Sequence, residues 1–233
     1  MIKSSKDVGG VDHAMKAVRK TKTMNKASGR DRRSAGKREA ILDAAATLFL
    51  GGGYLGVSMD DIAETSGVSK QTVYVYFSNK EALFVAMVSA LCNDASDRVH
   101  NDVAEFRDGD DLEGYLTAYA VRQLQIVLTP RILQLRRLVI GEVGRFPELG
   151  AALYAGGPER TITTLAAMFE RLAKRGVLSV RNPSLAATQF NWLIMSAPLN
   201  RAMLLGDGVI LTPDEIQRHA REAVRMFMAA YST

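Results

Sequence analysis

The sequence contains little cysteine and no long apolar run, and each absence excludes a class of protein. Cys92 is the only cysteine in 233 residues, so no disulfide can form within the chain and a reducing compartment, the cytoplasm, is expected. It lies among Met87, Val88 and Leu91, which favours a small buried residue over a redox sensor. No apolar stretch approaches the roughly 18 residues that a membrane span requires, and the amino terminus lacks the apolar core of a signal peptide. The sequence therefore predicts a soluble cytoplasmic protein with no membrane partner.

Histidine is also scarce, which argues against catalysis. The three histidines are far apart in the chain: His13, His100 and His219. The sequence has no zinc-protease motif, no cluster of cysteine and histidine, and no nucleophile elbow. The acids Asp60-Asp61 and Asp110-Asp111 are consecutive, so they suit helix starts and turns better than acid–base chemistry. We therefore predict no catalytic residue, no metal site and no cofactor.

A helix-turn-helix pattern occupies residues 58–80. Ser58 can cap a first helix, and two aspartates follow in the first turn, where the helix dipole favours negative charge. Gly67 stands where the chain must reverse, because glycine enters the left-handed conformation without steric penalty. Ser69 can cap the second helix, and Val73 is an apolar position within it. These lengths fit a DNA-reading pair whose second helix enters the major groove, although an ordinary helical corner has the same outline.

Around this pattern the chain resembles the tetracycline-repressor (TetR) family of bacterial transcription regulators, strongly over residues 37–84. The residues that carry the resemblance are Ile41-Leu42-Asp43-Ala44-Ala45, Phe49, Gly53-Tyr54, residues 57–63, Gly67-Val68-Ser69-Lys70 and residues 72–83. A looser resemblance, at residues 135–142 and 146–149, is to the AefR-like subgroup. The family implies an all-α fold with a helix-turn-helix DNA-binding domain at 35–82 and a ligand-binding and dimerisation domain at 83–233.

Positive charge is concentrated before these domains. The first 36 residues carry ten Lys or Arg against three Asp, a net charge of +7, so the remaining 197 residues sum to −2. Because this stretch has little apolar periodicity, residues 1–34 are predicted to be a disordered basic arm. The arm could contact DNA, or it could be a solvated extension or an overlong gene start, with Met24 as the true start. DNA contact is favoured for the cations that adjoin the domain: Lys26, Arg30, Arg32 and Arg33.

The rest of the chain is predicted to be helical, without strands or internal repeats. The expected helices cover about 35–51, 79–102, from 112 to before Pro130, 131–143, a segment ending at Gly176, 183–204 and 213–231. Gly156-Gly157-Pro158 is expected to interrupt one helix, and Pro198 another. Asn182-Pro183 and Thr212-Pro213 each look like a helix cap followed by proline at the first helical position.

The resemblance assigns DNA-binding roles to individual residues. It implies that Lys70, Gln71 and Thr72 reach base edges, while Ser58, Tyr74, Tyr76 and Lys80 hold phosphates. The complete predicted DNA-binding set is Ser58, Ser69, Lys70, Gln71, Thr72, Tyr74, Val75, Tyr76, Lys80, Arg30, Arg32 and Arg33. Tyr76 has a second interpretation, in which its ring packs in the core beneath Phe77.

The family also implies a homodimer built from the last two long helices, with a ligand pocket inside each larger domain. Inward-facing positions of residues 112–204 are mostly apolar or aromatic, so such a pocket suits a small apolar or aromatic effector. The candidate lining residues are Tyr115, Tyr119, Leu133, Met168, Phe169, Phe190, Trp192 and Met195. Each of these is also compatible with plain core packing. Arg136 and Arg137 are interpreted as surface or ion-paired residues, with ligand contact as the alternative.

Together these patterns predict a ligand-responsive transcription regulator whose partners are double-stranded operator DNA, a small-molecule effector and a second copy of the chain. A repressor is favoured over an activator by the resemblance alone. The alternative from another class is an architectural or recombination-accessory DNA-binding protein that uses the same motif without a ligand.

Overall fold

The structure is a computed structural model that describes residues 34–100, 106–107 and 109–232. The predicted contacts of Lys26, Arg30, Arg32 and Arg33 lie outside the described residues. Within the described ranges the chain is helical, and the only β pairing is one isolated bridge between Leu178 and Ser232. The all-α prediction is confirmed.

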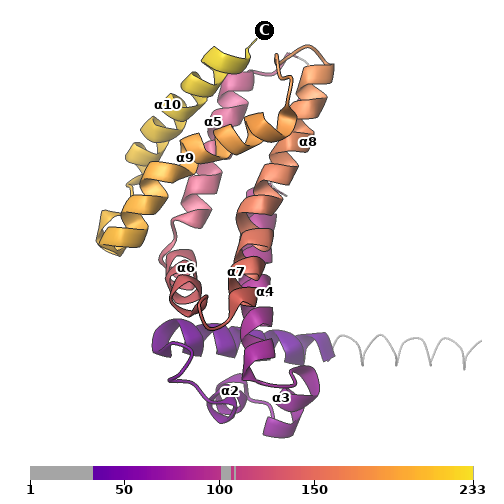
Figure 1. The fold of residues 1–233 in the computed structure, drawn as a ribbon, viewed down its shortest axis with the longest axis vertical. Coiled ribbons are helices and arrows are strands. Elements are labelled where there is room, and N and C mark those ends of the chain that lie inside the picture. The colour runs from indigo at the N-terminus through magenta and orange to yellow at the C-terminus, as the bar shows by residue number, and fades with distance from the viewer. Residues whose placement is uncertain (1–33, 101–105, 108, 233) are drawn as a thin grey trace, which may run out of the picture.

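The described helices follow one another with short connections. Residues 34–52 are helical and precede the labelled elements of Figure 1. These elements are α2 (Met59–Ser66), α3 (Lys70–Tyr76), α4 (Lys80–His100), α5 (Leu112–Val127), α6 (Pro130–Glu142), α7 (Pro147–Tyr154), η1 (Ala155–Glu159), α8 (Arg160–Lys174), α9 (Pro183–Leu205), η2 (Asp207–Val209) and α10 (Pro213–Tyr231). Among the described helices none is long and apolar enough to cross a membrane alone; α3 and α4 meet that test only as a pair bent by 67°.

The molecule is elongated, and α4 connects its two ends (Figure 1). The helix at 34–52 lies across the lower end, with α2 and α3 below it. From there α4 rises beside the continuous stretch α7–η1–α8, while α9 crosses the upper part and packs on α8 and α10. Helix α4 therefore links the end that carries α2 and α3 to the rest of the molecule.

Two hydrophobic clusters form the core. The upper cluster joins α5, α8, α9 and α10 around fully buried aromatic side chains such as Phe169, Phe190 and Phe227. The lower cluster joins the helix at 34–52, α2, α3 and α4, and it also takes in Leu135 and Val139 of α6. The domain boundary expected between residues 82 and 83 lies inside α4, and the lower cluster continues past it. The helix-turn-helix unit thus shares one hydrophobic cluster with α6 and α7.

Two expected helix interruptions were wrong. Gly156-Gly157-Pro158 lies in the π-helical turn η1, which joins α7 to α8 without a break. Proline has no backbone N–H to donate, and the wider π turn accommodates the loss of that hydrogen bond. Pro198 is buried inside the continuous helix α9, where apolar packing on both sides outweighs the loss of one backbone hydrogen bond.

The π turn brings its backbone against α4. A Cβ atom at Gly156 would lie 2.8 Å from Cβ of Cys92, which is too close for two carbon atoms. Cys92 is buried, as its apolar neighbours predicted, and burial raises the pKa of its thiol to about 11, so the thiol is protonated at neutral pH. Close packing rather than thiol chemistry therefore explains this contact.

Replacing Gly156 by alanine should destabilise the fold by about 1–3 kcal/mol, because the added methyl group forces α4 and η1 apart. Gly157→Ala is the matched control, since no heavy atom lies within 4 Å of a Cβ atom at that position. Urea unfolding of both variants measures the difference. Equal midpoints would show that the close approach to Cys92 is not a constraint.

Candidate nucleic-acid interface and internal cavity

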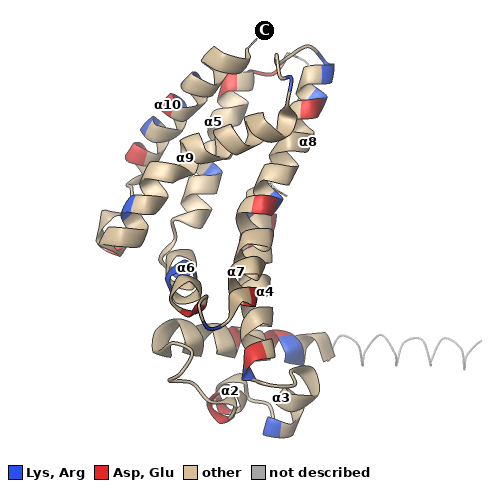
Figure 2. Cartoon of the chain, in the orientation of Figure 1, with Lys and Arg blue, Asp and Glu red and all other residues tan. Residues whose placement is uncertain are grey.

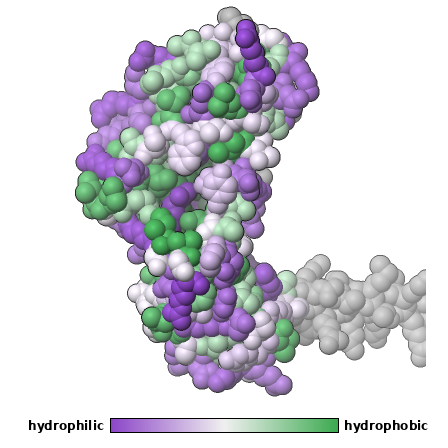
Figure 3. All heavy atoms as spheres, in the orientation of Figure 1, coloured by the Kyte–Doolittle hydropathy of each residue, from purple (hydrophilic) through white to green (hydrophobic). Residues whose placement is uncertain are grey.

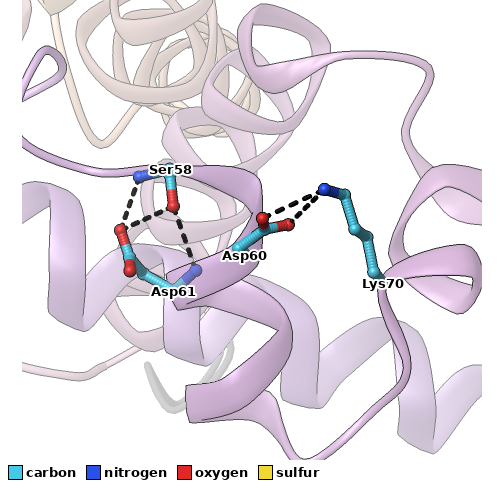
Figure 4. A network of polar contacts seen from close by, with 4 residues as sticks. All are labelled: Ser58, Asp60, Asp61 and Lys70. Carbon is cyan, nitrogen blue, oxygen red and sulfur yellow. Dashed lines mark hydrogen bonds and ion pairs between the residues drawn. The ribbon is translucent and has the colours of Figure 1, made fainter.

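The first helix of the helix-turn-helix is fixed at both ends by local interactions. Ser58 and Asp61 form a capping box: the Asp61 amide donates to Ser58 Oγ at 3.2 Å, and the Ser58 amide donates to Asp61 Oδ2 at 2.8 Å (Figure 4). The hydrogen bond from the Ser58 hydroxyl, at 2.7 Å, is the main reason that the pKa of Asp61 lies below its usual value. Gly67 ends the helix at φ 67°. The cap and the glycine turn confirm the sequence prediction, but they also direct the Ser58 hydroxyl proton to Asp61 rather than to solvent.

The second helix, α3, presents one face to solvent. Ser69 caps it by accepting from the Thr72 amide at 3.2 Å, and the two hydroxyl groups lie 2.8 Å apart. Val73 is fully buried, as predicted, so Gln71 is exposed and Tyr74 and Val75 are 45% and 77% exposed. A short helix with a fixed start and a bare outward face, at one extreme of the molecule, is suited to docking on a groove (Figure 1).

Lys70, at the start of α3, is bound to α2. Its Nζ lies 2.7 Å from Oδ1 of Asp60, and both side chains are largely exposed (Figure 4). The hydrogen bond that Lys70 Nζ donates to Asp60 raises the pKa of the Lys70 ammonium. Exposed pairs of this kind contribute little to stability, so Lys70 can exchange Asp60 for another acceptor at small cost.

Tyr76 makes contacts within the protein through both its ring and its hydroxyl, while its predicted phosphate contact stays a prediction. Its ring is half-buried against the lower cluster, and its hydroxyl lies 2.6 Å from Ser34 Oγ and donates to Ser34 O at 3.0 Å. Tyr76 thereby holds the helix at 34–52 beside the end of α3. Arg38 of that helix lies near the same place, with Cζ 5.6 Å from the centre of the Phe77 ring, and the sequence analysis did not assign it.

Lys80 lies against the junction between the two parts of the molecule. Its Nζ is 4.3 Å from the centre of the Tyr54 ring, and its pKa is lowered first by burial and then by the nearby charge of Arg145. Tyr54 also contacts Phe146 of the α6–α7 connection, with ring centres 4.6 Å apart. The charge expected to hold a phosphate is therefore placed over an aromatic ring that touches the upper part of the molecule.

An internal cavity of about 50 Å³ lies between α4, α5, α6, α9 and the η1–α8 stretch. Of the predicted pocket residues, Trp192 and Met195 line it. Another cavity, of about 490 Å³, is lined by Tyr115, Tyr119 and Met168. The other candidates are fully buried and line neither cavity: Leu133, Phe169 and Phe190. The structure therefore divides the predicted set between two cavities and the core.

The smaller cavity contains polar groups that the sequence analysis did not assign, together with Arg136, for which ligand contact was the alternative. Gln123 Nε2 donates to Asn191 Oδ1 at 2.8 Å, and both side chains are buried. Gln123 Oε1, Ser96 Oγ and Arg136 Nε are buried without a hydrogen-bond partner among the described protein atoms. The sequence did contain a signal for these groups. Ser96 and Gln123 are polar residues at positions where the helical periodicity predicts an apolar, buried side chain.

The larger cavity has a different character. Its wall includes His100, whose Nδ1 lies 3.5 Å from the Tyr119 hydroxyl. Burial, and then the charge of Arg160, lower the pKa of His100, while burial raises the pKa of Tyr119. Within the described ranges no group of three His, Cys, Asp or Glu is placed to hold a metal ion.

Comparisons with known proteins agree with this architecture. The family described as "Bacterial regulatory proteins, tetR family" matches residues 41–87, and "AefR-like transcriptional repressor, C-terminal domain" matches residues 114–233, about half of the chain. The crystal structure of a TetR-family transcriptional regulator from Mesorhizobium loti is 35% identical, has a TM-score of 0.81, and is matched over 86% of this chain and 99% of that one. The chain belongs to the TetR family of bacterial transcription regulators.

Two further TetR-like relatives differ in how much they cover. The structure named Flavonoid-responsive Regulator FrrA is 32% identical with a TM-score of 0.70, over 84% of this chain and 97% of that one. The HTH-type transcriptional regulator RutR of Escherichia coli is 42% identical over 59 residues, which span 25% of this chain and only 28% of RutR. TetR-family members are transcription regulators, not enzymes, that bind operator DNA and typically act as dimers with small-molecule effectors.

Replacing Tyr76 by phenylalanine should release the helix at 34–52 from α3, because only the hydroxyl contacts Ser34. We expect a loss of about 0.5–1.5 kcal/mol of stability and faster amide exchange at residues 35–40. Tyr74→Phe is the control, since Tyr74 is exposed on the outward face of α3. Similar exchange rates in the two variants would contradict this role for Tyr76.

Proposed function

We propose that the protein is a homodimeric repressor that binds double-stranded operator DNA through α3 and is released by a small, mainly apolar or aromatic effector. The observation that carries this proposal is the bare outward face of α3, where Gln71, Tyr74 and Val75 are exposed on a helix capped by Ser69. The identification with the AefR-like C-terminal domain supports the repressor role.

In this proposal Lys70, Gln71 and Thr72 read base edges, while Ser58, Tyr74, Tyr76 and Lys80 contact phosphates. Gln71 is exposed and free to form the pair of hydrogen bonds that an adenine edge accepts and donates. Lys70 would leave Asp60, and Lys80 would turn away from the Tyr54 ring towards the DNA backbone. Both rearrangements replace weak surface interactions by contacts with phosphate or base.

The dimer interface would be formed by α9 and α10. Arg201 is the one charged residue of α9, and this helix is largely free of coloured charge in Figure 2. The large apolar side chains exposed on these helices include Leu185, Leu205 and Met226. Such a surface is better covered by a second copy than left in water, and a twofold pair would present two α3 helices about 34–36 Å apart, or a multiple of that distance.

Helix α6 offers a route from effector to DNA. Ile132, Leu135 and Arg136 of α6 line the small cavity, and the connection after α6 carries Phe146, which packs on Tyr54. A volume of about 50 Å³ is far below that of an occupied ligand site, so an effector must push α6 away from its neighbours. Phe146 would carry this movement to the helix-turn-helix. The response of FrrA to flavonoids supports an aromatic effector.

Movement of this kind links the two ligands of the protein. In the dimer, the distance between the two α3 helices must match the DNA. An effector that favours another distance must therefore lower operator affinity. By thermodynamic linkage, the operator then lowers effector affinity by the same factor.

Sequencing the genomic DNA fragments that the purified protein retains tests the proposed function. We expect enrichment of an inverted repeat whose half-sites are one helical turn apart or a multiple of it. Retained fragments of random sequence would contradict the proposal. If the repeat is enriched but no small molecule changes the thermal stability of the protein, the architectural alternative is favoured.

Gln71→Ala should change base preference at one operator position by about 1–3 kcal/mol, because it removes a base-edge contact. Lys80→Ala is the contrasting variant: it should weaken binding to all sequences about equally and lower the salt slope by about one. Affinities for operator and random duplexes at several salt concentrations distinguish the two. Equal losses for both duplexes in the Gln71 variant would show that Gln71 is not a base reader.

Replacing Arg30, Arg32 and Arg33 by alanine should reduce the slope of log affinity against log salt by about 0.9 for each phosphate that the arm no longer neutralises. Stability should be unchanged, because Ser34 and its hydrogen bond with Tyr76 are kept. Titration of the operator at several salt concentrations gives the slope. An unchanged slope would favour the interpretation of the arm as a solvated extension.

A further inference from the structure

Arg136 is a half-buried cation, and no counter-charge lies beside it among the described residues. It lies on α6 in the wall of the small cavity, its Nε has no hydrogen-bond partner, and no ion pair of Arg136 is found among the described residues. The adjacent Arg137 shows the usual arrangement: its Nη2 lies 2.8 Å from Asp207 Oδ1 and donates to Ala202 O at 2.8 Å. The two arginines therefore differ in that only Arg137 is satisfied by the protein.

A buried guanidinium nitrogen without a partner, such as Arg136 Nε, is costly, because burial removes water and nothing replaces it. Burial lowers the pKa of Arg136, yet an arginine side chain remains protonated in proteins. A positive charge therefore faces the cavity, and an anion placed there would recover the missing interaction. The Cys92 thiol, which lines the same cavity, is protonated at neutral pH and supplies no negative charge to Arg136.

Other groups define what else the anion must carry. Ser96 Oγ and Gln123 Oε1 line the same cavity and are also buried without partners. Asn191 holds the amide nitrogen of Gln123, so the amide oxygen is the free acceptor. The rest of the wall is largely apolar, with side chains such as Val99 and Met195. The cavity thus offers a charged donor, a hydroxyl and one acceptor in an apolar enclosure.

We propose that the effector is a carboxylic acid with an aromatic or apolar body, whose carboxylate pairs with Arg136 and whose body displaces the apolar wall of the cavity. A hydroxyl or amide donor on that body would satisfy Gln123 Oε1. This inference rests on the proposed function, because it identifies the cavity occupant with the effector. The planar guanidinium is suited to a carboxylate, which it can bind through two parallel hydrogen bonds.

A route for such an acid is present. An open groove of about 920 Å³ between α6 and α9 shares Arg136, Trp192 and Leu199 with the small cavity. Figure 3 shows a hollow on this face, between the upper and lower parts of the molecule, with apolar side chains on its rim. An acid in the groove reaches Arg136 first, and its body then follows past Trp192 into the cavity. Trp192 is the only tryptophan of the chain, so its fluorescence reports this step.

Pairs of acids and their neutral amides test the proposal on the full-length protein: acetate and acetamide, benzoate and benzamide, cinnamate and cinnamamide. Binding is followed by Trp192 fluorescence and by the shift in melting temperature. We expect at least one acid to bind about tenfold or more tightly than its amide, as a charge-assisted hydrogen bond predicts. Equal binding of acid and amide in every pair, or no binding of any acid, would overturn the proposal.

Arg136→Met tests the residue itself, because methionine retains most of the side-chain volume without the charge. It should abolish the preference for the acid, whereas Arg136→Lys should keep part of it. Arg131→Met is the matched control, since Arg131 is exposed on the same helix, and it should keep the full preference. If the methionine variant does not fold, Arg136→Gln takes its place. A preference for acids that survives loss of the Arg136 charge would overturn the proposal.

Operator binding, measured separately, distinguishes this inference from the proposed function. If a neutral amide releases the operator as effectively as its acid, the proposed regulator function stands, and the proposal that the effector is a carboxylic acid is wrong. The opposite result is also possible to recognise. If acids bind in an Arg136-dependent way but the protein retains no specific DNA, the anion site is real and the proposed function is wrong.

Discussion

The aromatic contact at Tyr54 is the constraint on which the rest of this architecture depends. Its ring packs on Phe84 of α4 and on Phe146 of the α6–α7 connection, with centres 5.1 Å and 4.6 Å apart. These three rings come from separate segments, and within the lower cluster they join the segment before α2 to α4 and to the α6–α7 connection. Because a close-packed interior leaves little free space, this aromatic contact is where a movement of α6 would first reach the segment that leads into α2. Lys80 and Arg145, which both lie over the Tyr54 ring, add positive charge to this junction.

The surface that faces DNA combines fixed and exchangeable interactions. The caps of α2 and α3 join groups only three residues apart, so they form as soon as the helices form and hold the backbone of the motif. Lys70, by contrast, is held by a single exposed ion pair with Asp60, and Lys80 by an aromatic ring. A regulator needs this division, because its frame must persist while its charged side chains exchange protein partners for phosphates.

The interior shows the opposite arrangement, in which polar groups are kept although the protein does not satisfy them. Ser96, Gln123 and Arg136 come from three different helices and meet at one small cavity. An apolar core of the same shape would be more stable, since each unsatisfied group carries a desolvation cost. Their presence is accounted for if the cavity is occupied during part of the functional cycle. The helices around it are then held in a closed state that a ligand can open.

Local patterns in the sequence determined the helix-turn-helix, its two serine caps and the glycine turn, because each depends on residues within four positions of one another. Apolar periodicity likewise determined the all-α class. Only the tertiary structure decided that the chain continues as helix through Gly156 and Pro198, and that the predicted pocket residues divide between two cavities and the core. It also decided that Arg136 faces a cavity while Arg137 pairs with Asp207, 70 residues away. Periodicity identifies the buried face of a helix, but which distant segment covers that face depends on packing between helices, which no local pattern encodes.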